Sequence, residues 1–267
     1  MSDASLLNRV VLITGGSRGL GREMALALAE AGAKIAITGT IESKAMEATL
    51  EELGKGAIAL PADVTNPEAA ADAVAKTVET FGRLDVLINN AGIGMRLISE
   101  TFNTQPTKFW ETDPDVWRRI VNTNVNGTFL MASAAVPHML AQSFGKIINI
   151  STSDQTMVRQ GYAPYGPTKA FLEATSRVWA ADLAGTGVDV NVLLPGGAAD
   201  TDLLPPSPNK KGADGNLLSP TVMRAPALWL ASDASNGITG ARYIARLWQD
   251  TNPDAARDDG GEKPRIM

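Results

Sequence analysis

The stretch that decides the fold is TGGSRGLG, residues 14–21, which follows the apolar run RVVLIT at 9–14. The β-branched residues of that run favour a strand, and a helical pattern follows it, because apolar side chains recur at Leu20, Met24 and Leu28. Glycines between a strand and a helix let backbone N–H groups approach a phosphate at the positive end of the helix. An ordinary βα turn has a similar composition, so the strand and helix on either side carry the prediction of a phosphate-binding turn.

The same alternation of short apolar runs and longer helical patterns continues along the chain. Six further runs predict strands, at 34–38, 57–61, 84–89, 146–151, 188–194 and 242–245. Helical patterns lie between the runs, at 19–31, 42–53, 67–81, 115–142, 166–184 and 221–231. The runs are nearly continuously apolar, as in parallel strands covered on both faces. We therefore predict an α/β fold, a doubly wound parallel sheet of about seven strands with helices on both faces and right-handed crossovers.

No composition shift divides the chain, so we expect one domain over residues 1–250. Two irregular stretches, 93–114 and 195–220, have the length of lids or binding loops. The charged stretch 251–267, which contains Pro and Gly, predicts a disordered tail.

Composition excludes several kinds of chemistry. The 267 residues include no cysteine and one histidine, His138, which excludes disulfides, thiolate nucleophiles and sites that need two histidines, so we expect no metal site. A net charge of −5 disfavours nucleic acid as a partner. No apolar run reaches the ~18 residues of a membrane span, and the polar N-terminus does not match a signal peptide. We expect a cytoplasmic protein with no membrane partner.

Further motifs follow the glycine-rich turn in a fixed order. NNAG occupies 89–92, Asn124 lies in a helical pattern, and Tyr165 and Lys169 are four residues apart at the start of another helix. Over residues 8–245 this order resembles the short-chain dehydrogenase/reductase family. The resemblance implies a Rossmann-like fold and an NAD(P)-dependent oxidoreductase that interconverts a carbonyl and a secondary alcohol by hydride transfer.

The resemblance also implies which residues bind the dinucleotide. They lie in six segments: the phosphate turn, the end of the second strand, the adenine contact, the NNAG segment, the helix with Tyr165 and Lys169, and the turn after strand six. In chain order they are Gly15, Ser17, Arg18, Gly19, Leu20, Gly21, Thr40, Asp63, Val64, Asn90, Ala91, Gly92, Tyr165, Lys169, Pro195 and Gly196. The threonine that follows the last of these turns in the family comes one residue late here, at Thr201.

Cofactor preference depends on the end of the second strand. NAD-binding folds place an acid there for the ribose 2′-hydroxyl, but residues 37–41 contain none. Arg18 matches a family position whose base contacts a 2′-phosphate, and a guanidinium suits phosphate geometrically. Thr40 stands where NADP-binding relatives carry a second base, and Glu42 is close enough to serve as an unconventional ribose ligand. We predict NADP(H) as the preferred cofactor, with NAD(H) as the alternative.

Tyr165 and Lys169 share one face of their helix. Ionising a phenol of pKa ~10 at pH 7 costs about 4 kcal/mol, and an ammonium ~4 Å away supplies roughly that amount at an effective dielectric of ~20. We therefore predict Tyr165 as general acid/base, with its pKa lowered by Lys169. By resemblance, Lys169 also holds the nicotinamide ribose. Tyr162, seven residues before Lys169, has the spacing of a divergent branch of the family, and we expect it to line the substrate pocket.

The family uses a serine at the end of strand five to hydrogen-bond the substrate oxygen. Thr152 is in register with that serine, thirteen residues before Tyr165, and Ser153 is the alternative. Asn124 matches the asparagine whose helix kink carries a water relay to the lysine.

The loops that should border the nicotinamide carry apolar side chains, which suggests a mainly apolar pocket for a medium-sized ketone or secondary alcohol. They are Met95, Phe109, Trp110, Met157, Leu203 and Leu204. Arg96 and Arg159 could meet a carboxylate. By resemblance, helices 115–142 and 166–184 form a four-helix interface, so we expect a homodimer or homotetramer. The threonine at 152 and the missing Asp-Gly-Gly of the last strand keep one alternative open, a catalytically silent dinucleotide-binding sensor or scaffold.

Overall fold

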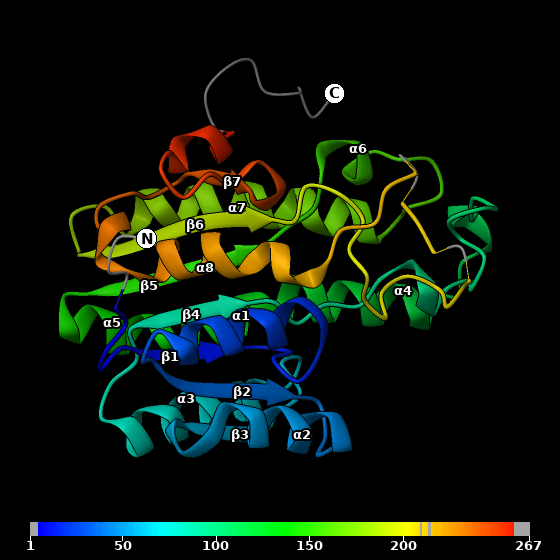
Figure 1. Cartoon of the computed structure of the whole chain (residues 1–267). Coiled ribbons are helices and arrows are strands. Elements are labelled where there is room, and N and C mark those ends of the chain that lie inside the picture. Colours follow the sequence, from blue (N-terminus) through cyan, green and yellow to red (C-terminus); the bar gives the residue numbers. More distant parts are fainter. Residues whose placement is uncertain (1–4, 209, 213–214, 259–267) are drawn as a thin grey trace.

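One parallel sheet of seven strands forms the centre of the molecule (Figure 1). The computed structural model describes residues 5–208, 210–212 and 215–258. The strand order is β3-β2-β1-β4-β5-β6-β7, and each neighbouring pair is parallel. The strands are β1 (Val10–Ile13), β2 (Lys34–Gly39), β3 (Ala57–Pro61), β4 (Val86–Asn89), β5 (Gly145–Ile150), β6 (Val188–Leu194) and β7 (Arg242–Ile244).

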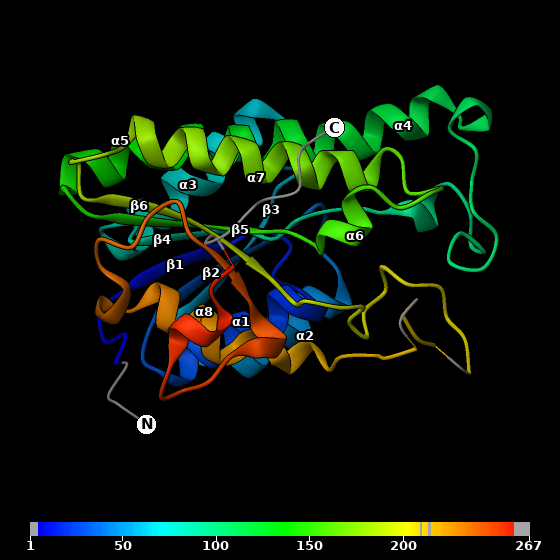
Figure 2. The ribbon, with the colours of Figure 1, turned by 90° about the horizontal axis from the view of Figure 1, so that it is seen from above.

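Helices cover both faces of the sheet, as Figure 2 shows from above. One face carries α1 (Gly19–Glu30), α2 (Lys44–Leu53) and α8 (Arg224–Ala231). The other carries α3 (Pro67–Phe81), α4 (Pro114–Val121), α5 (Thr128–Gln142) and α7 (Tyr165–Asp182), and the short α6 (Asp154–Met157) follows β5. The predicted fold class is confirmed.

The sheet divides the core into two layers because successive side chains of a strand point to opposite faces. Val11 and Ile13 of β1 pack with Met24 and Leu28 of α1, whereas Val10 packs on the opposite side with residues of α3 and α5. All four β1 side chains are buried. This explains why the strands read as continuous apolar runs.

The topology fixes where a ligand can bind. The chain runs outward from β1 to β3 and then returns to β4 on the other side of β1, so the strand order reverses between β1 and β4. Ligands of doubly wound sheets bind at the carboxyl ends of the strands at such a point. In Figure 1 the strand arrows point toward α4, α6 and the long loop before α8.

Two features differ from the sequence-based expectations. The predicted helix 115–142 is divided into α4 and α5 by a π-helical segment, Asn122–Gly127. The expected disorder of 251–267 does not hold for residues 251–258, where a 3₁₀ turn, Pro253–Ala256, buries Ala256 against the core. Residues 259–267 lie outside the described residues. In the part of the chain that the structure describes, no helix is long and apolar enough to cross a membrane.

Candidate active site

The glycine-rich turn is built by close backbone packing. Gly15 and Gly19 have φ of 62° and 56°, in the left-handed region that favours glycine. A Cβ on Gly21 would lie 2.4 Å from the Gly15 carbonyl oxygen, and one on Gly15 would lie 3.0 Å from Ala91 Cα. The spacing of the glycines is therefore a steric requirement of this turn.

The NNAG segment holds the turn in place. Asn90 Nδ2 donates to the carbonyl oxygens of Thr14 and Gly15, at 3.0 Å each. In return, Thr14 Oγ1 accepts hydrogen bonds from the backbone N–H groups of Asn90 and Ala91, also at 3.0 Å. The segments that follow β1 and β4 thus form one unit at the point where the strand order reverses.

The N-terminus of α1 fits an anion. Arg18 precedes the helix in an extended conformation and makes no side-chain capping hydrogen bond. The first N–H groups of a helix lack intrahelical partners and lie at its positive end. Ser17 lies beside them, and its carbonyl oxygen accepts from Thr49 Oγ1 at 2.9 Å. The residues of this turn therefore suit a pyrophosphate.

The residues predicted for the adenosine end lie around the ends of β2 and β3. Thr40 is exposed, whereas Val64 is buried against Gly127 of the π-helical segment, where a Cβ would come within 2.6 Å of Val64 Cγ2. The Asp63 carboxylate accepts from the Thr65 N–H and hydroxyl at 2.9 and 2.8 Å, so it forms a local turn.

Arg18 is 70% exposed and forms an ion pair with Asp202 at 3.2 Å. The partner comes from the loop after β6, which also brings Thr201 over Gly19, since a Cβ on Gly19 would lie 3.2 Å from Thr201 Cγ2. Of the turn before that loop, Pro195 is buried, and Gly196 has φ of 88° and is packed against Ile244.

Tyr165 and Thr152 meet at the carboxyl end of β5. The Thr152 side chain acts on the Tyr165 hydroxyl and lowers the pKa of the phenol. Burial has the larger, opposite effect and raises the pKa of Tyr165 to about 12. The phenol is therefore firmly protonated at neutral pH.

Lys169 is held away from the phenol. Its Nζ donates to the Ile150 carbonyl oxygen at 2.8 Å and lies 6.0 Å from the centre of the Tyr165 ring. Burial lowers the pKa of Lys169 to about 8, and the charge of Glu173 partly opposes that shift. The expectation that Lys169 lowers the pKa of Tyr165 is wrong for the protein by itself. Burial of the phenol dominates, and the Lys169 ammonium is hydrogen-bonded to the carbonyl oxygen at the end of β5.

Ser153 and Thr152 are distinguished by their partners. The Ser153 hydroxyl pairs with Thr156 Oγ1 at 2.9 Å, within the first turn of α6. The hydroxyl of Thr152 instead faces that of Tyr165. Of the two residues, Thr152 is therefore the one whose side chain meets the phenol.

Asn124 connects the NNAG segment to α7. It is buried in the π-helical segment, and its amide exchanges two hydrogen bonds of 3.0 Å with the backbone of Ile93 and donates one of 3.1 Å to Thr168 Oγ1. A Cβ on Gly92 would lie 3.3 Å from Asn124 Oδ1 and 3.7 Å from Lys169 Nζ. Gly92, Asn124 and Lys169 therefore meet at one point.

The residues expected to line the substrate pocket differ in burial and in their contacts. Met95 is fully buried, Phe109 and Trp110 are exposed and pack edge-to-face on each other, and Leu203 covers Gly94. Tyr162 packs edge-to-face against the buried Phe102.

Both arginines considered for a carboxylate have partners. Arg96 pairs with Glu100, and Arg159 stacks on the Tyr162 ring at 5.0 Å from its centre.

Two residues near the site were missed. Glu173 lies one turn after Lys169 on α7 and accepts from the Ser151 hydroxyl at 2.7 Å. Arg242 lies in β7, 7% exposed, and donates to Glu173 and to the Thr152 carbonyl oxygen. The sequence offered one signal for Arg242, a charged residue within the predicted strand 242–245, because a buried charge requires partners.

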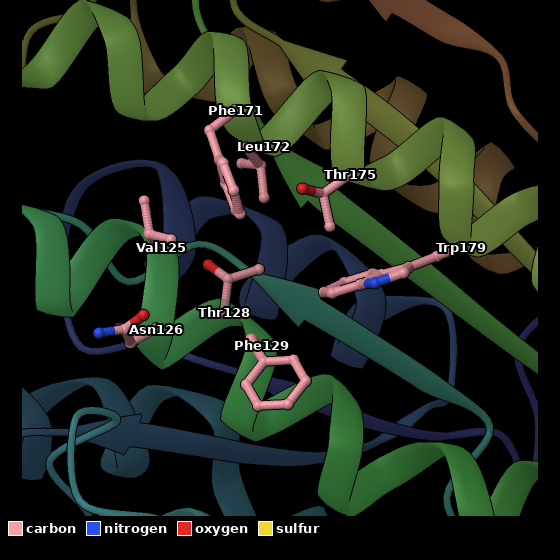
Figure 3. A pocket seen from close by; sticks show the side chains of 8 residues that line it. All are labelled: Val125, Asn126, Thr128, Phe129, Phe171, Leu172, Thr175 and Trp179. Carbon is pink, nitrogen blue, oxygen red and sulfur yellow. The ribbon is translucent and has the colours of Figure 1, made fainter.

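The helices predicted to form an interface leave an apolar groove between them. Figure 3 shows the residues that line it, Val125, Asn126, Thr128, Phe129, Phe171, Leu172, Thr175 and Trp179. Phe129 and Phe171 are 54% and 49% exposed.

Comparisons with known proteins agree with this geometry. The family model of the short chain dehydrogenases matches residues 9–212. The 3-oxoacyl-[acyl-carrier-protein] reductase of Synechocystis sp. is 36% identical, with 72% of this chain and 75% of the relative covered. The acetoacetyl-CoA reductase of Shinella zoogloeoides is 32% identical over 90% of this chain and 97% of that one.

A solved structure points the same way. The 3-ketoacyl-(acyl-carrier-protein) reductase of Brucella melitensis, complexed with NADH, aligns with a TM-score of 0.78 and 30% identity, covering 89% of this chain and 96% of that one. The chain belongs to the short-chain dehydrogenase/reductase family. Within it, the protein is an NAD(P)-dependent oxidoreductase.

Proposed function

We propose that this protein interconverts a carbonyl and a secondary alcohol, with Tyr165 as the general acid/base. The observation that carries the proposal is that the Thr152 side chain acts on the Tyr165 phenol, at the carboxyl end of a central strand. Each hydroxyl has one proton to donate, so both can bond one carbonyl oxygen placed between them. Lys169 lies behind them and meets the NNAG segment at Gly92.

The residues around the glycine-rich turn fit a nicotinamide dinucleotide. The uncapped N-terminus of α1 and the turn at 15–19 would hold the pyrophosphate, and Gly92 and Lys169 would lie along the nicotinamide ribose. When bound, this group supplies or accepts the hydride.

The chain's own residues handle the proton. Thr152 and Tyr165 would orient the carbonyl oxygen, and Tyr165 would protonate the alkoxide that hydride addition produces. A phenol with a pKa of about 12 is fully protonated at neutral pH, which suits the acid in the reductive direction. The oxidative direction requires the phenolate, so it depends on a lower pKa in the complex.

We propose that NADP(H) is preferred. Arg18 stands exposed beside the phosphate turn, and residues 37–41 at the end of β2 offer no carboxylate to the ribose. The surface pair with Asp202 is weak enough to exchange for a phosphate, since exposed pairs contribute about 0–1 kcal/mol.

For substrate we propose a small-molecule ketone or secondary alcohol. The named relatives reduce 3-oxoacyl groups on acyl carrier protein and acetoacetyl-CoA, so 3-oxo thioesters are the first compounds to test. We also propose a cytoplasmic homodimer or homotetramer that uses the groove at Phe129 and Phe171.

The test compares wild type with Tyr165→Phe on acetoacetyl-CoA, simple 3-oxo esters and cyclic ketones, with NADPH oxidation followed by absorbance. Wild type should turn over at least one compound. Tyr165→Phe should lose about a thousandfold or more in kcat, given the 10²–10⁴ typical of acid/base catalysis, and still bind NADPH. Tyr162→Phe is the matched control and should keep kcat. If the wild type binds NADPH but reduces none of the panel, the sensor or scaffold alternative is favoured instead.

A further inference from the structure

Arg242 is an unusual residue for its place in the fold. It begins β7, pairs in register with Val192 of β6, and is followed by the fully buried Tyr243. Burying a guanidinium costs several kcal/mol unless its donors are satisfied. A cation in an otherwise apolar run therefore needs a specific set of acceptors.

The guanidinium finds acceptors in three other segments. Nε donates to both carboxylate oxygens of Glu173 at 3.0 Å, and Nη2 donates to Asp154 Oδ1 at 2.7 Å and to the Thr152 carbonyl oxygen at 3.3 Å. Nη1 bonds the carboxylate of Asp258. Only a planar fork of donors can reach all of these acceptors at once.

Two of these partners lead directly to the proposed catalytic groups. Arg242 Nη2 donates to the carbonyl oxygen of Thr152, whose side chain acts on the Tyr165 phenol. Glu173, one turn beyond Lys169 on α7, also accepts from Ser151, and its charge acts on that lysine. Arg242 thus joins the end of β5 to α7.

Asp258 belongs to the C-terminal segment, drawn in red beside β7 in Figure 1. The Asp258 N–H donates to the Arg242 carbonyl oxygen at 2.8 Å, and Arg257 forms an antiparallel bridge with Tyr243. Side chain and backbone of Arg242 therefore both hold this segment against the end of the sheet.

We propose that Arg242 is a positioning residue, which fixes Thr152 relative to Tyr165 by tying the end of β5 to Glu173 and to Asp258 of the C-terminal segment. The proposal rests on the proposed function, because it assumes that Thr152 and Tyr165 hold the substrate oxygen. The C-terminal segment is then part of the support of the active site.

The first test is Arg242→Met in the full-length chain, assayed with NADPH and whichever panel ketone the wild type reduces. Because a displacement of about 1 Å can cost up to a hundredfold in rate, kcat per folded molecule should fall about tenfold or more. The dissociation constant of NADPH should change less than about twofold, since no contact of Arg242 reaches the phosphate turn. Asp258→Asn, which removes one arm only, should give a smaller loss in the same direction.

Arg9→Met is the matched control. Arg9 is also partly buried and paired with Asp85 and Asp233, but it lies at the opposite end of the sheet. This variant should lower the melting temperature without changing kcat per folded molecule. If Arg242→Met behaves in the same way, the residue is merely structural and the proposal is overturned.

Hydrogen exchange gives a readout that needs no substrate. In Arg242→Met and Asp258→Asn, the amides of residues 151–157 should exchange faster, whereas those of the phosphate turn at 15–21 should not. Unchanged exchange at 151–157 would overturn the proposal. Failure of Tyr165→Phe to reduce turnover would instead reject the proposed function, so the two failures are distinguishable.

Discussion

The side chain of Thr152 faces the Tyr165 hydroxyl and lowers the pKa of the phenol, while the adjacent Ser153 hydroxyl is hydrogen-bonded to Thr156 Oγ1 at 2.9 Å. Adjacent residues therefore face different partners at the end of β5. The backbone enters α6 at this point, so Ser153 lies at the first turn of a helix and Thr152 remains with the strand end.

This relationship predicts different outcomes for substitutions at the two positions. Thr152→Ser should keep kcat/KM for ketone reduction within a few-fold, because the hydroxyl is retained. Thr152→Val should lower it about 10- to 100-fold, the value of a hydrogen bond to a developing charge. Ser153→Ala should have little effect, and a larger loss there than in Thr152→Val would contradict the assignment.

Cofactor preference can be tested at Arg18. Arg18→Ala should raise the dissociation constant of NADPH about tenfold, the loss of one charge-assisted contact, and leave that of NADH nearly unchanged. Asp202→Asn should tighten NADPH binding slightly, because the carboxylate no longer competes for the guanidinium. Fluorescence titration measures both constants, and equal losses for the two cofactors in Arg18→Ala would contradict the prediction.

The pH dependence of kcat/KM for NADPH should follow the ionisation of Lys169. Burial lowers the pKa of this lysine from 10.5 to about 8, so the ammonium is present below that pH and lost above it. If the charged form holds the ribose, kcat/KM for NADPH should be flat below pH 8 and fall about tenfold per pH unit above it. Tyr165, with a pKa of about 12, stays protonated throughout that range.

Lys169→Met provides the comparison for this profile. Its kcat/KM should be low and should show no inflection near pH 8. A wild-type profile that stays flat up to pH 10 would contradict the role of the charged lysine.

A second buried lysine affects stability at the other end of the sheet. Lys146 donates to Ser235 Oγ at 2.8 Å and lies 3.9 Å from Asp189. Burial lowers the pKa of Lys146 to about 8 and raises that of Asp189. Burial therefore opposes the charged forms of both groups.

The double variant Lys146→Met with Asp189→Asn should consequently be more stable than wild type at pH 7, by about 1 kcal/mol or more. The lysine's share of this gain should be full below pH 8 and disappear by about pH 10.5, where the residue is neutral in both folded and unfolded chains. Urea unfolding at several pH values measures the difference. A variant less stable than wild type at pH 7 would contradict the prediction.

The apolar groove between α5 and α7 predicts an assembly interface. Phe171→Glu should convert a dimer or tetramer into smaller species, because a charge placed in a buried apolar contact is strongly unfavourable. Phe109→Glu is the control, since Phe109 is 64% exposed outside this groove and should not affect mass. Sedimentation velocity gives the result, and a monomeric wild type would contradict the prediction.

Much of the fold followed from local patterns. The strand from Val10 to Ile13 is buried on both faces, so its continuous apolar composition predicts a parallel strand covered on both sides. The glycines of the phosphate turn were recognisable because Gly15 and Gly21 have no room for a side chain. The resemblance implied a helix kink at Asn124, but local periodicity did not show the π-helical segment, because the hydrogen bonds of Asn124 to Ile93 and Thr168 join it to other segments.

The electrostatics of the site could be predicted only in part. The spacing of Tyr165 and Lys169 placed them on one helical face, but the carbonyl oxygen of Ile150, nineteen residues earlier, holds the ammonium. Burial of the phenol, which no local spacing specifies, is the largest effect and raises the pKa of Tyr165 instead of lowering it.

By itself, the sequence determined the periods of the strands and helices, the turn that requires glycine, and the order of the chemical groups along the chain. These features depend on neighbours within a few residues, so they are written in local composition and spacing. Only the tertiary structure decided that Thr152 rather than Ser153 faces the phenol, and that Arg242 joins segments 69, 88 and 90 residues away. Such contacts depend on how the strands and helices pack around a buried charge, which no local pattern specifies.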